Sequence, residues 1–349
     1  MPLLTERQAQ IAFLVQGKPG MSSSQIRKGL GIDISLVTIK RDIAALVENG
    51  YFTLEGSGRS VTYSITRRGR VLLPVDAHAY AAREPDMRGG SERFDLALFP
   101  DFPPTLFNGD ELAVLERATE TYRERSKGMS PTLHQKELER FVIELSWKSS
   151  RIEGNTYTLL DTERLIRDGV TAEGHAKDEA TMILNHKKAF GFVREQKDAF
   201  SGKIGRATIE EVHRLLVDGL GVASGVRRGI VGITGSIYRP LDNAYQIDEA
   251  LGSLYDATDA AHDVYTKALL LLGGISYIQP FEDGNKRTGR LSANGVLIAS
   301  ACAPLSYRNV DEVAYREALI VLYEVRSFDP LKRLFIEQYE FAATHYAGV

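Results

Sequence analysis

The sequence is poor in cysteine, in long apolar runs and in net charge. Its 349 residues include one cysteine, Cys302, so no disulfide can form within the chain, which fits a reducing compartment. No run reaches the ~18 apolar residues that a membrane span needs, and the opening MPLLTERQAQ lacks a basic and then apolar signal segment. A net charge of −3 excludes a generic binder of polyanions. We therefore expect a soluble, cytoplasmic protein with no membrane partner.

The chain is long enough for several packed cores. A hydrophobic content of 43% over this length suits two or three globular units. Shifts in composition and pattern divide it into an N-terminal unit at 1–70, a linker at 71–107 and a helical domain at 108–349. The expected fold is mainly α, with one small α+β domain.

The N-terminal unit reads as three short helices followed by a hairpin. The predicted elements are helices from Thr5 to Val15, from Ser22 to Gly31 and from Ser35 to Asn49, and strands at 51–54 and 61–65. Ser22 and Ser35 are N-cap residues, and Gly50 ends the third helix. This order resembles a winged helix-turn-helix domain, with 35–49 in the place of the recognition helix.

Positive charge is concentrated in this unit. Residues 1–70 hold ten Lys/Arg and five Asp/Glu, a net charge of +5, which leaves −8 for the remainder. Thr38, Lys40 and Arg41 lie early in the third helix, where such domains reach base edges and phosphates, and Arg59 lies near the wing tip. Duplex DNA is therefore an expected partner. Winged helices also serve as protein-docking or dimerisation modules, and this alternative role for the unit stays open.

The linker and the helical domain differ in how often Pro and Gly interrupt the pattern. Residues 71–107 are interrupted by Pro and Gly and contain one short predicted strand at 94–99. From residue 108 the pattern is almost entirely helical. Helices are predicted at 110–125, 133–151, 161–168, 175–197, 207–219, 246–263, 265–278, 285–300, 311–324 and 328–345. An alternation of β-branched residues and Gly predicts a hairpin at 230–240.

One polar stretch, 279–290, lies between two apolar runs that read as buried helices. Gly284 and Asn285 tolerate positive φ, so the stretch turns and then opens a helix. Free N–H groups at a helix start bind anions, and Lys286, Arg287 and Arg290 add positive charge. The carboxylate of Asp283 among these cations suits a phosphate-bound Mg²⁺, although it could also simply cap the helix.

The same stretch resembles the signature of Fic domains, His-Pro-Phe-x-Asp-Gly-Asn-Gly-Arg-x-x-Arg. It matches at every defined position except two. Gln279 stands where the family has its histidine, and Lys286 stands where it has its second loop glycine. The resemblance implies an all-helical Fic core that uses ATP and Mg²⁺.

A second motif precedes this core. Ser149, Glu153 and Gly154 occupy the defining positions of a motif that resembles the inhibitory helix of Fic proteins, Ser/Thr-x-x-x-Glu-Gly/Asn, here at about 133–155. The resemblance implies that Glu153 pairs with Arg290 and keeps that arginine from a γ-phosphate. The predicted hairpin resembles the Fic flap, against which a target segment is laid by β-augmentation, with Thr234, Ser236 and Tyr238 along it. His213 is expected to be structural, because its spacing follows a helix face.

Fic domains typically transfer the AMP part of ATP to a Ser, Thr or Tyr hydroxyl of a protein. Carried over, Asp283 would hold Mg²⁺, Phe281 would anchor the loop, and Gly284, Asn285, Lys286, Arg287 and Arg290 would bind the nucleotide. Gln279 occupies the position of the catalytic histidine, which takes the hydroxyl proton. A carboxamide cannot act as a general base, and losing one typically costs about 10²–10⁴-fold in rate.

Two other functions stay open at this point. Lys286 resembles the Doc-like branch of the family, which transfers the γ-phosphoryl group instead. Alternatively the protein is a DNA-binding regulator whose Fic domain only senses ATP or forms a homodimer.

Overall fold

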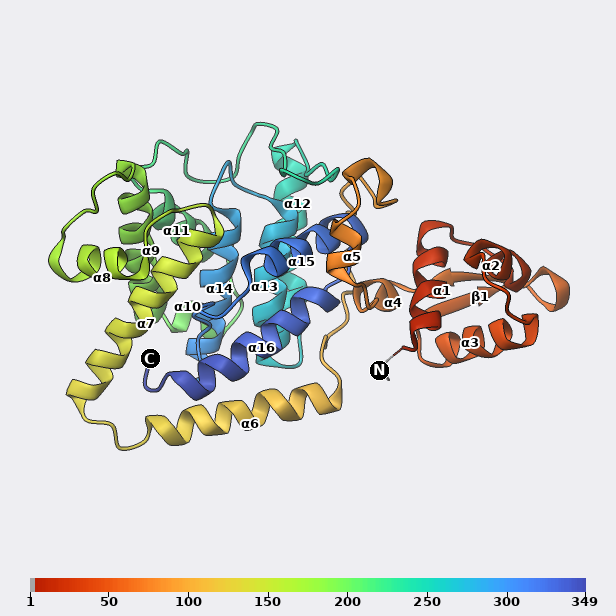
Figure 1. Ribbon diagram of the computed structural model, residues 1–349, viewed down its shortest axis with the longest axis horizontal. Coiled ribbons are helices and arrows are strands. Elements are labelled where there is room, and N and C mark those ends of the chain that lie inside the picture. The colour runs from red at the N-terminus through yellow and green to blue at the C-terminus, as the bar shows by residue number, and fades with distance from the viewer. Residues whose placement is uncertain (1–3) are drawn as a thin grey trace.

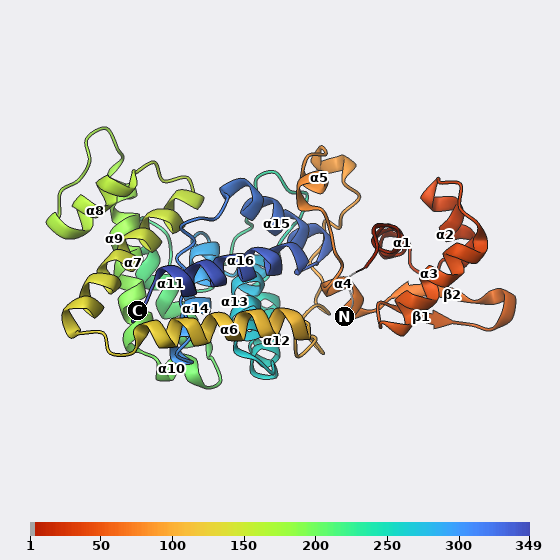
Figure 2. The same ribbon diagram turned by 60° about the horizontal axis from the view of Figure 1, so that its bottom comes forward.

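The computed structural model describes residues 4–349, except for the side chain of Arg59. A small N-terminal unit lies at one end of a larger helical body in both views (Figure 1, Figure 2). The unit consists of α1 (Glu6–Gly17), α2 (Ser23–Leu30), α3 (Leu36–Glu48), β1 (Phe52–Glu55) and β2 (Thr62–Ile65). The three helices and the antiparallel hairpin predicted for this part of the chain are confirmed.

Side-chain caps start these three helices. The hydroxyl of Thr5 accepts a hydrogen bond from the backbone N–H of Gln8, and that of Ser22 accepts one from Gln25. In both cases the glutamine side chain accepts a bond from the cap residue in return, which completes a capping box. Ser35 caps α3 through its own hydroxyl. The predicted helix starts at Ser22 and Ser35 are therefore correct.

A connector of short elements joins the unit to the body. It contains α4 (Arg67–Val71), α5 (Ala77–Ala81) and a 3-10 turn at Pro85–Met87. The strand predicted at 94–99 does not form, so that prediction was wrong. A turn forms instead, in which the Leu98 N–H donates to the Asp95 carbonyl oxygen at 3.0 Å. The turn directs Leu98 and Phe99 into the core of the body, where each is 2% exposed.

The helical body agrees with the predicted mainly α fold. Its helices are α6 (Gly109–Ser126), α7 (Pro131–Ile152), α8 (Leu159–Asp168), α9 (Lys177–Glu195), α10 (Asp198–Ser201), α11 (Arg206–Val217), α12 (Ala244–Asp259), α13 (Val264–Ile278), α14 (Asn285–Ala299), α15 (Glu312–Val325) and α16 (Asp329–His345). Among these helices, only the short α10 was not predicted from the sequence. Within the described residues, no helix combines the length and the apolarity needed to cross a membrane.

Helices α13 and α14 run through the middle of the body (Figure 1). Residues 268–278 and 291–298 are buried at every position, as expected for two helices inside the core. The helices approach closely because small residues line their contact. At Gly289 a Cβ atom would lie 2.9 Å from the carbonyl oxygen of Leu272. The loop between these helices is therefore held by two tightly packed neighbours.

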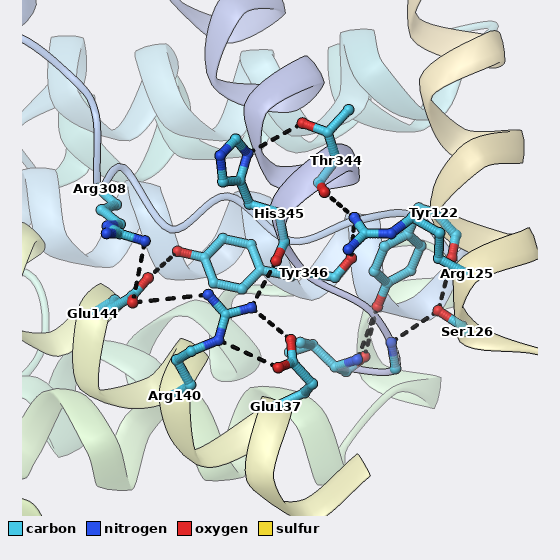
Figure 3. Close-up of polar contacts among 12 residues, drawn as sticks. Tyr122, Arg125, Ser126, Glu137, Arg140, Glu144, Arg308, Thr344, His345 and Tyr346 are labelled. Atoms are coloured by element: carbon cyan, nitrogen blue, oxygen red, sulfur yellow. Dashed lines mark hydrogen bonds and ion pairs between the residues drawn. The ribbon is translucent and has the colours of Figure 1, made fainter. Parts of the chain in front are cut away.

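The segment after α16 fastens α7 and α6 to the body, and Figure 3 shows its polar contacts. The hydroxyl of Tyr346 donates to Glu144 of α7, and the guanidinium of Arg140 lies 4.7 Å from the centre of the Tyr346 ring. The backbone N–H of Gly348 donates to the Ser126 hydroxyl of α6 at 2.8 Å. Helix α6 also lies along α16 (Figure 2). Helix α7 is thus anchored well before its C-terminal end.

We predict that Gly289→Ala destabilises the fold, because the added methyl group would force α13 and α14 apart. Overpacking of this kind costs about 1–3 kcal/mol, which lowers the midpoint of urea unfolding. Gly252→Ala is the matched control, since Gly252 is exposed on α12 with open space around its Cβ position. For the control we expect no loss and a gain of up to about 1 kcal/mol. Equal midpoints for the two variants would contradict close packing of α13 on α14.

Candidate functional site

The loop at residues 279–284 is stabilised by its own side chains. Gln279 ends α13 in the left-handed region, with φ 51°, and Gly284 precedes α14 with φ 77°. The side chain of Asn285 accepts a bond from the Phe281 N–H at 2.8 Å and donates to the Phe281 carbonyl oxygen at 2.8 Å. Asn285 is 4% exposed, and these two bonds use its side chain to close the loop. Only its backbone N–H is left to bind a ligand.

Gln279 has both ends of its carboxamide engaged. Its Nε2 donates to the Ser276 carbonyl oxygen at 2.6 Å, and its Oε1 accepts from Asn285 Nδ2 at 3.0 Å. The side chain is 9% exposed and offers no group that takes up a proton near neutral pH. Gln279, predicted to stand where the family has its histidine, therefore serves here as a structural hydrogen-bonding group.

His213 of α11 supports the loop from below. Its ring stacks on Phe281 with centroids 3.8 Å apart and 9° between the planes, and Phe281 is fully buried, as predicted. The Nε2–H of His213 donates to the Asp283 carbonyl oxygen at 3.0 Å. Burial is the main cause that lowers the pKa of His213 to about 4, so the ring is neutral. These contacts agree with the structural role expected for this histidine.

Two arginines of α14 are buried beside the loop. Arg287 is 1% exposed and Arg290 is fully buried. Among the described residues, Nε and Nη1 of Arg287 and Nη1 of Arg290 have no hydrogen-bond partner. Buried N–H groups without acceptors are costly, and a bound anion would supply the acceptors. Together with the first N–H groups of α14, these guanidinium groups form a candidate anion site.

Asp283 is the one carboxylate of the loop that pairs with these arginines. Its side chain is 64% exposed and its Oδ2 lies 3.0 Å from Arg287 Nη2. In the described part of the chain, no group of three or more His, Cys, Asp or Glu side chains could hold a metal ion. The Asp283 carboxylate could serve as one ligand of an Mg²⁺ ion that takes its other ligands from phosphate oxygens and water, as magnesium commonly does. It does not form a metal site by itself.

The end of α7 reaches this anion site. Glu153 Oε1 lies 2.8 Å from Arg290 Nη2, and Glu153 Oε2 lies 2.7 Å from Lys286 Nζ. The ion pair with Arg290 that the sequence implied is present, whereas the pair with Lys286 was not foreseen. Gly154 follows with φ 98° and turns the chain away from the helix. The Glu153 carboxylate therefore forms ion pairs with two of the basic side chains that were predicted to bind a nucleotide.

Ser149 lies one turn earlier on α7 and fixes the same arginine. Its hydroxyl accepts from Arg290 Nε at 2.8 Å, and its carbonyl oxygen accepts from Arg290 Nη2 at 2.9 Å. The hydroxyl also contacts His186 Nε2 of α9 at 2.7 Å. Burial lowers the pKa of His186, so that ring is neutral. Two of the three motif residues, Ser149 and Glu153, thus contact Arg290.

The predicted hairpin at 230–240 does not form, so that prediction was wrong. Within the described residues, the segment has one turn, from the Ser236 N–H to the Ile233 carbonyl oxygen at 3.1 Å, and no paired strands. Contacts with the body replace a ladder. The Tyr238 hydroxyl donates to the Tyr277 carbonyl oxygen at 2.7 Å, and Tyr238 is 2% exposed. Ser236 is also held by the body, and of the three predicted docking residues only Thr234 is exposed.

Arg227 is a site residue that sequence reasoning missed. It is 2% exposed and donates from Nε to the Gln279 carbonyl oxygen at 2.7 Å. Its Nη1 and Nη2 donate to the carbonyl oxygens of Gly229 and Leu241, at the two ends of the flap segment. The flap segment, defined as residues 229–241, is therefore tied to the signature loop. No local pattern distinguishes Arg227 from the neighbouring Arg228.

The predicted DNA-contacting residues lie on α3 of the N-terminal unit. Lys40 and Arg41 are exposed, whereas Thr38 is half-buried and its hydroxyl contacts that of Ser35 at 2.9 Å. The side chain of Arg59 lies outside the described residues. The site of the helical body and these lysine and arginine side chains belong to separate parts of the chain.

The chain matches known sequences over part of its length. Residues 203–297 match the sequence model of the Fic/DOC family. The chain is 28% identical over 179 residues to a protein named protein adenylyltransferase Fic from Nematostella vectensis. This match includes 50% of the present chain and 41% of that protein, so the chain spans less than half the length of this relative.

Solved structures share the fold. A fragment of Fic-1 from C. elegans has a TM-score of 0.58 and 18% identity, with 98% of this chain and 92% of that chain covered. A Fic domain containing signaling protein from Bacteroides thetaiotaomicron has a TM-score of 0.56 and 19% identity, with coverages of 66% and 94%. The chain therefore contains a Fic domain and is homologous, over the matched half of its length, to protein adenylyltransferase Fic.

Proposed function

We propose that the helical body transfers AMP from ATP to a Ser, Thr or Tyr hydroxyl of a target protein, and that Glu153 holds it in an inhibited state. The observation that carries this proposal is the ion pair of Glu153 with Arg290 and Lys286, at an anion site with unpaired guanidinium N–H groups. Homology to a protein adenylyltransferase supports AMP transfer as the reaction.

The nucleotide would bind at the start of α14. The backbone N–H groups of Gly284, Asn285 and Lys286 would surround its phosphates, and Arg287 and Arg290 would neutralise the β and γ groups. Asp283 would bind Mg²⁺ once it gives up its contact with Arg287. The metal would supply further positive charge to the phosphates.

In the transfer step, the target hydroxyl oxygen forms a bond to the α-phosphorus, the bond to the bridging oxygen breaks, and pyrophosphate leaves. The hydroxyl proton must go to a base during this attack. Gln279 cannot take it and can only orient the hydroxyl, because its carboxamide is a hydrogen-bonding group. Water would have to accept the proton, so this chain would be slow by about 10²–10⁴-fold compared with a site that has a histidine there.

Inhibition would follow from competition for one cation. While Glu153 pairs with Arg290, that guanidinium cannot receive a phosphate, and the negative carboxylate repels one. Burial acts to raise the pKa of Glu153, but attraction from Arg290 and then Lys286 outweighs it and lowers the pKa to about 2. The carboxylate is therefore ionised at any physiological pH.

The flap segment would dock the target. It forms no ladder of its own in the described residues, so the backbone groups that its contacts with the body and the connector leave free would pair with an added strand. Thr234 is exposed and would contact the target directly, whereas Ser236 and Tyr238 would hold the segment on the body.

A second function is favoured by the N-terminal unit. We propose that it is a winged helix-turn-helix domain that binds duplex DNA through α3, because Lys40 and Arg41 are exposed there. If the Fic domain only senses ATP, as the absence of a base at Gln279 would allow, the protein would be a DNA-binding regulator. Transfer of the γ-phosphoryl group, which Lys286 suggests, is the remaining alternative.

We predict that Glu153→Gly raises the affinity for Mg²⁺-ATP about tenfold in calorimetry, within the usual range for competing sites. Glu173→Gly, at an exposed turn, is the control and should leave the affinity unchanged.

In the Glu153→Gly background, Gln279→His should raise transfer of α-phosphate label to protein by about 10²–10⁴-fold. Label from the γ-phosphate alone would indicate phosphotransfer, and no label from either would indicate a sensor.

We predict a specific pH dependence for the Glu153 ion pairs. A lowered pKa stabilises the folded state above the unfolded value of 4.5, and this stabilisation is lost as pH falls toward about 2. The difference in free energy of unfolding between the wild type and Glu153→Gln should be on the order of 3 kcal/mol near neutral pH. It should shrink between pH 4.5 and 2. A difference that stays constant over this range would contradict the ion pairing.

We predict that Lys40→Ala with Arg41→Ala weakens binding to duplex DNA and reduces its dependence on salt, by about 1–2 in the slope of log K against log salt. Fluorescence anisotropy at several salt concentrations measures both. Lys203→Ala, an exposed lysine of the body, should change neither quantity. Binding that does not weaken with salt would argue against phosphate contacts by α3.

A further inference from the structure

A buried carboxylate joins the flap segment to the connector. Glu324 of α15 has a side chain with no exposed surface and accepts four hydrogen bonds. Its Oε2 accepts from the Tyr80 hydroxyl at 2.9 Å, and its Oε1 accepts from Arg88 Nη1 at 3.2 Å. Two further donors come from the flap segment, the Ser236 hydroxyl at 2.7 Å and the Ile237 N–H at 3.3 Å.

Arg88 of the connector spans the same junction. It is 6% exposed, and its Nη1 also donates to the flap carbonyl oxygen of Gly235 at 2.7 Å. Its other donors reach back to the connector, from Nη2 to the Ala81 carbonyl oxygen and from Nε to the Arg83 carbonyl oxygen, each at 3.0 Å. Arg88 and Glu324 therefore hold three consecutive flap positions from two directions.

The connector is itself fixed to the N-terminal unit. The ring of Tyr80 on α5 packs edge-on against Phe13 of α1, with centroids 6.2 Å apart. Gln16 of α1 donates to the carbonyl oxygen of Val325, the residue that follows Glu324, at 2.6 Å. Figure 1 shows α5 beside α15, on the side of the body that faces the N-terminal unit. The contacts thus run from α1 through the connector to the flap.

The hydrogen bonds around Glu324 depend on one another. A carboxylate buried without solvent is stable only where a cation and several donors compensate it, and removing one of them leaves the others unpaired. In the described residues the flap segment forms no strand, and its one isolated β-bridge joins Arg239 to Arg93, so its position depends largely on such contacts. The flap positions that donate to Glu324 lie next to the exposed Thr234 and Gly235, where a target strand would be added.

We propose that Glu324, held by Arg88 and Tyr80, is the positioning residue for the flap segment, so that the edge offered to a target is set from the connector. This inference rests on the proposed docking role of the flap. A target segment would be recognised through backbone hydrogen bonds along an edge whose geometry this buried cluster maintains.

Hydrogen exchange of the full-length chain tests the proposal without requiring activity. In Glu324→Gln, peptides that cover residues 229–241 should exchange about tenfold faster, while peptides of α13 and α14 keep their wild-type rates. Glu317→Gln is the matched control on the same helix, since its partner His78 is largely exposed. The control should leave flap exchange unchanged. Unchanged flap exchange in Glu324→Gln would overturn the proposal.

A milder variant covers the case in which Glu324→Gln loosens the whole body. Tyr80→Phe removes only the hydroxyl that the connector donates to Glu324. It should raise flap exchange about threefold with no effect elsewhere. An equal rise in all peptides of the body, or no rise in the flap, would show a purely structural cluster and overturn the positioning role.

Calorimetry with Mg²⁺-ATP separates this inference from the proposed function. In the Glu153→Gly background, Glu324→Gln should leave ATP affinity unchanged, because Glu324 contacts the flap rather than the arginines of α14. ATP binding that is absent in both backgrounds would refute the proposed function, while faster flap exchange would still support the positioning role.

Discussion

The contact between Glu153 and Arg290 is the interaction on which the site depends. A guanidinium inside a protein core is unfavourable unless acceptors surround it, and Arg290 is fully buried in α14. The end of α7 supplies those acceptors through Ser149 and Glu153. The segment after α16 anchors α7 through Glu144, which precedes both Ser149 and Glu153 on the chain, and so holds the end of the helix in place. The contact between Glu153 and Arg290 completes the core and occupies the candidate anion site.

The loop at residues 279–284 is held in place by contacts that its sequence motif alone does not reveal. Asn285 closes the loop from within, His213 stacks beneath Phe281, and Arg227 binds the carbonyl oxygen of Gln279. Each of these side chains is buried and satisfies backbone groups that a loop inside a core would otherwise leave unpaired. A rigid loop keeps its N–H groups pointed at one place, which is what anion binding requires.

The flap segment shows a different solution. It carries β-branched residues and glycine, yet in the described residues its strand-like pairing is limited to one isolated bridge, from Arg239 to Arg93, and side chains of the body and the connector hold it. These contacts hold the segment near the site and engage several of its backbone groups. The segment is thus fixed at a few buried points rather than by a continuous ladder.

The sequence by itself determined what depends on neighbouring residues. Ser35 and the apolar spacing after it define α3, and two apolar runs around a Gly-Asn turn define α13, the loop and α14, since caps and periodicity act within a few residues. Only the tertiary structure decided which distant groups meet. Lys286 pairs with Glu153, Arg227 reaches Gln279, and the β-like patterns at 94–99 and 230–240 yield to burial against the body. Long-range contacts override weak local β preference because a strand is stable only with a partner, and here the core offered side-chain contacts instead.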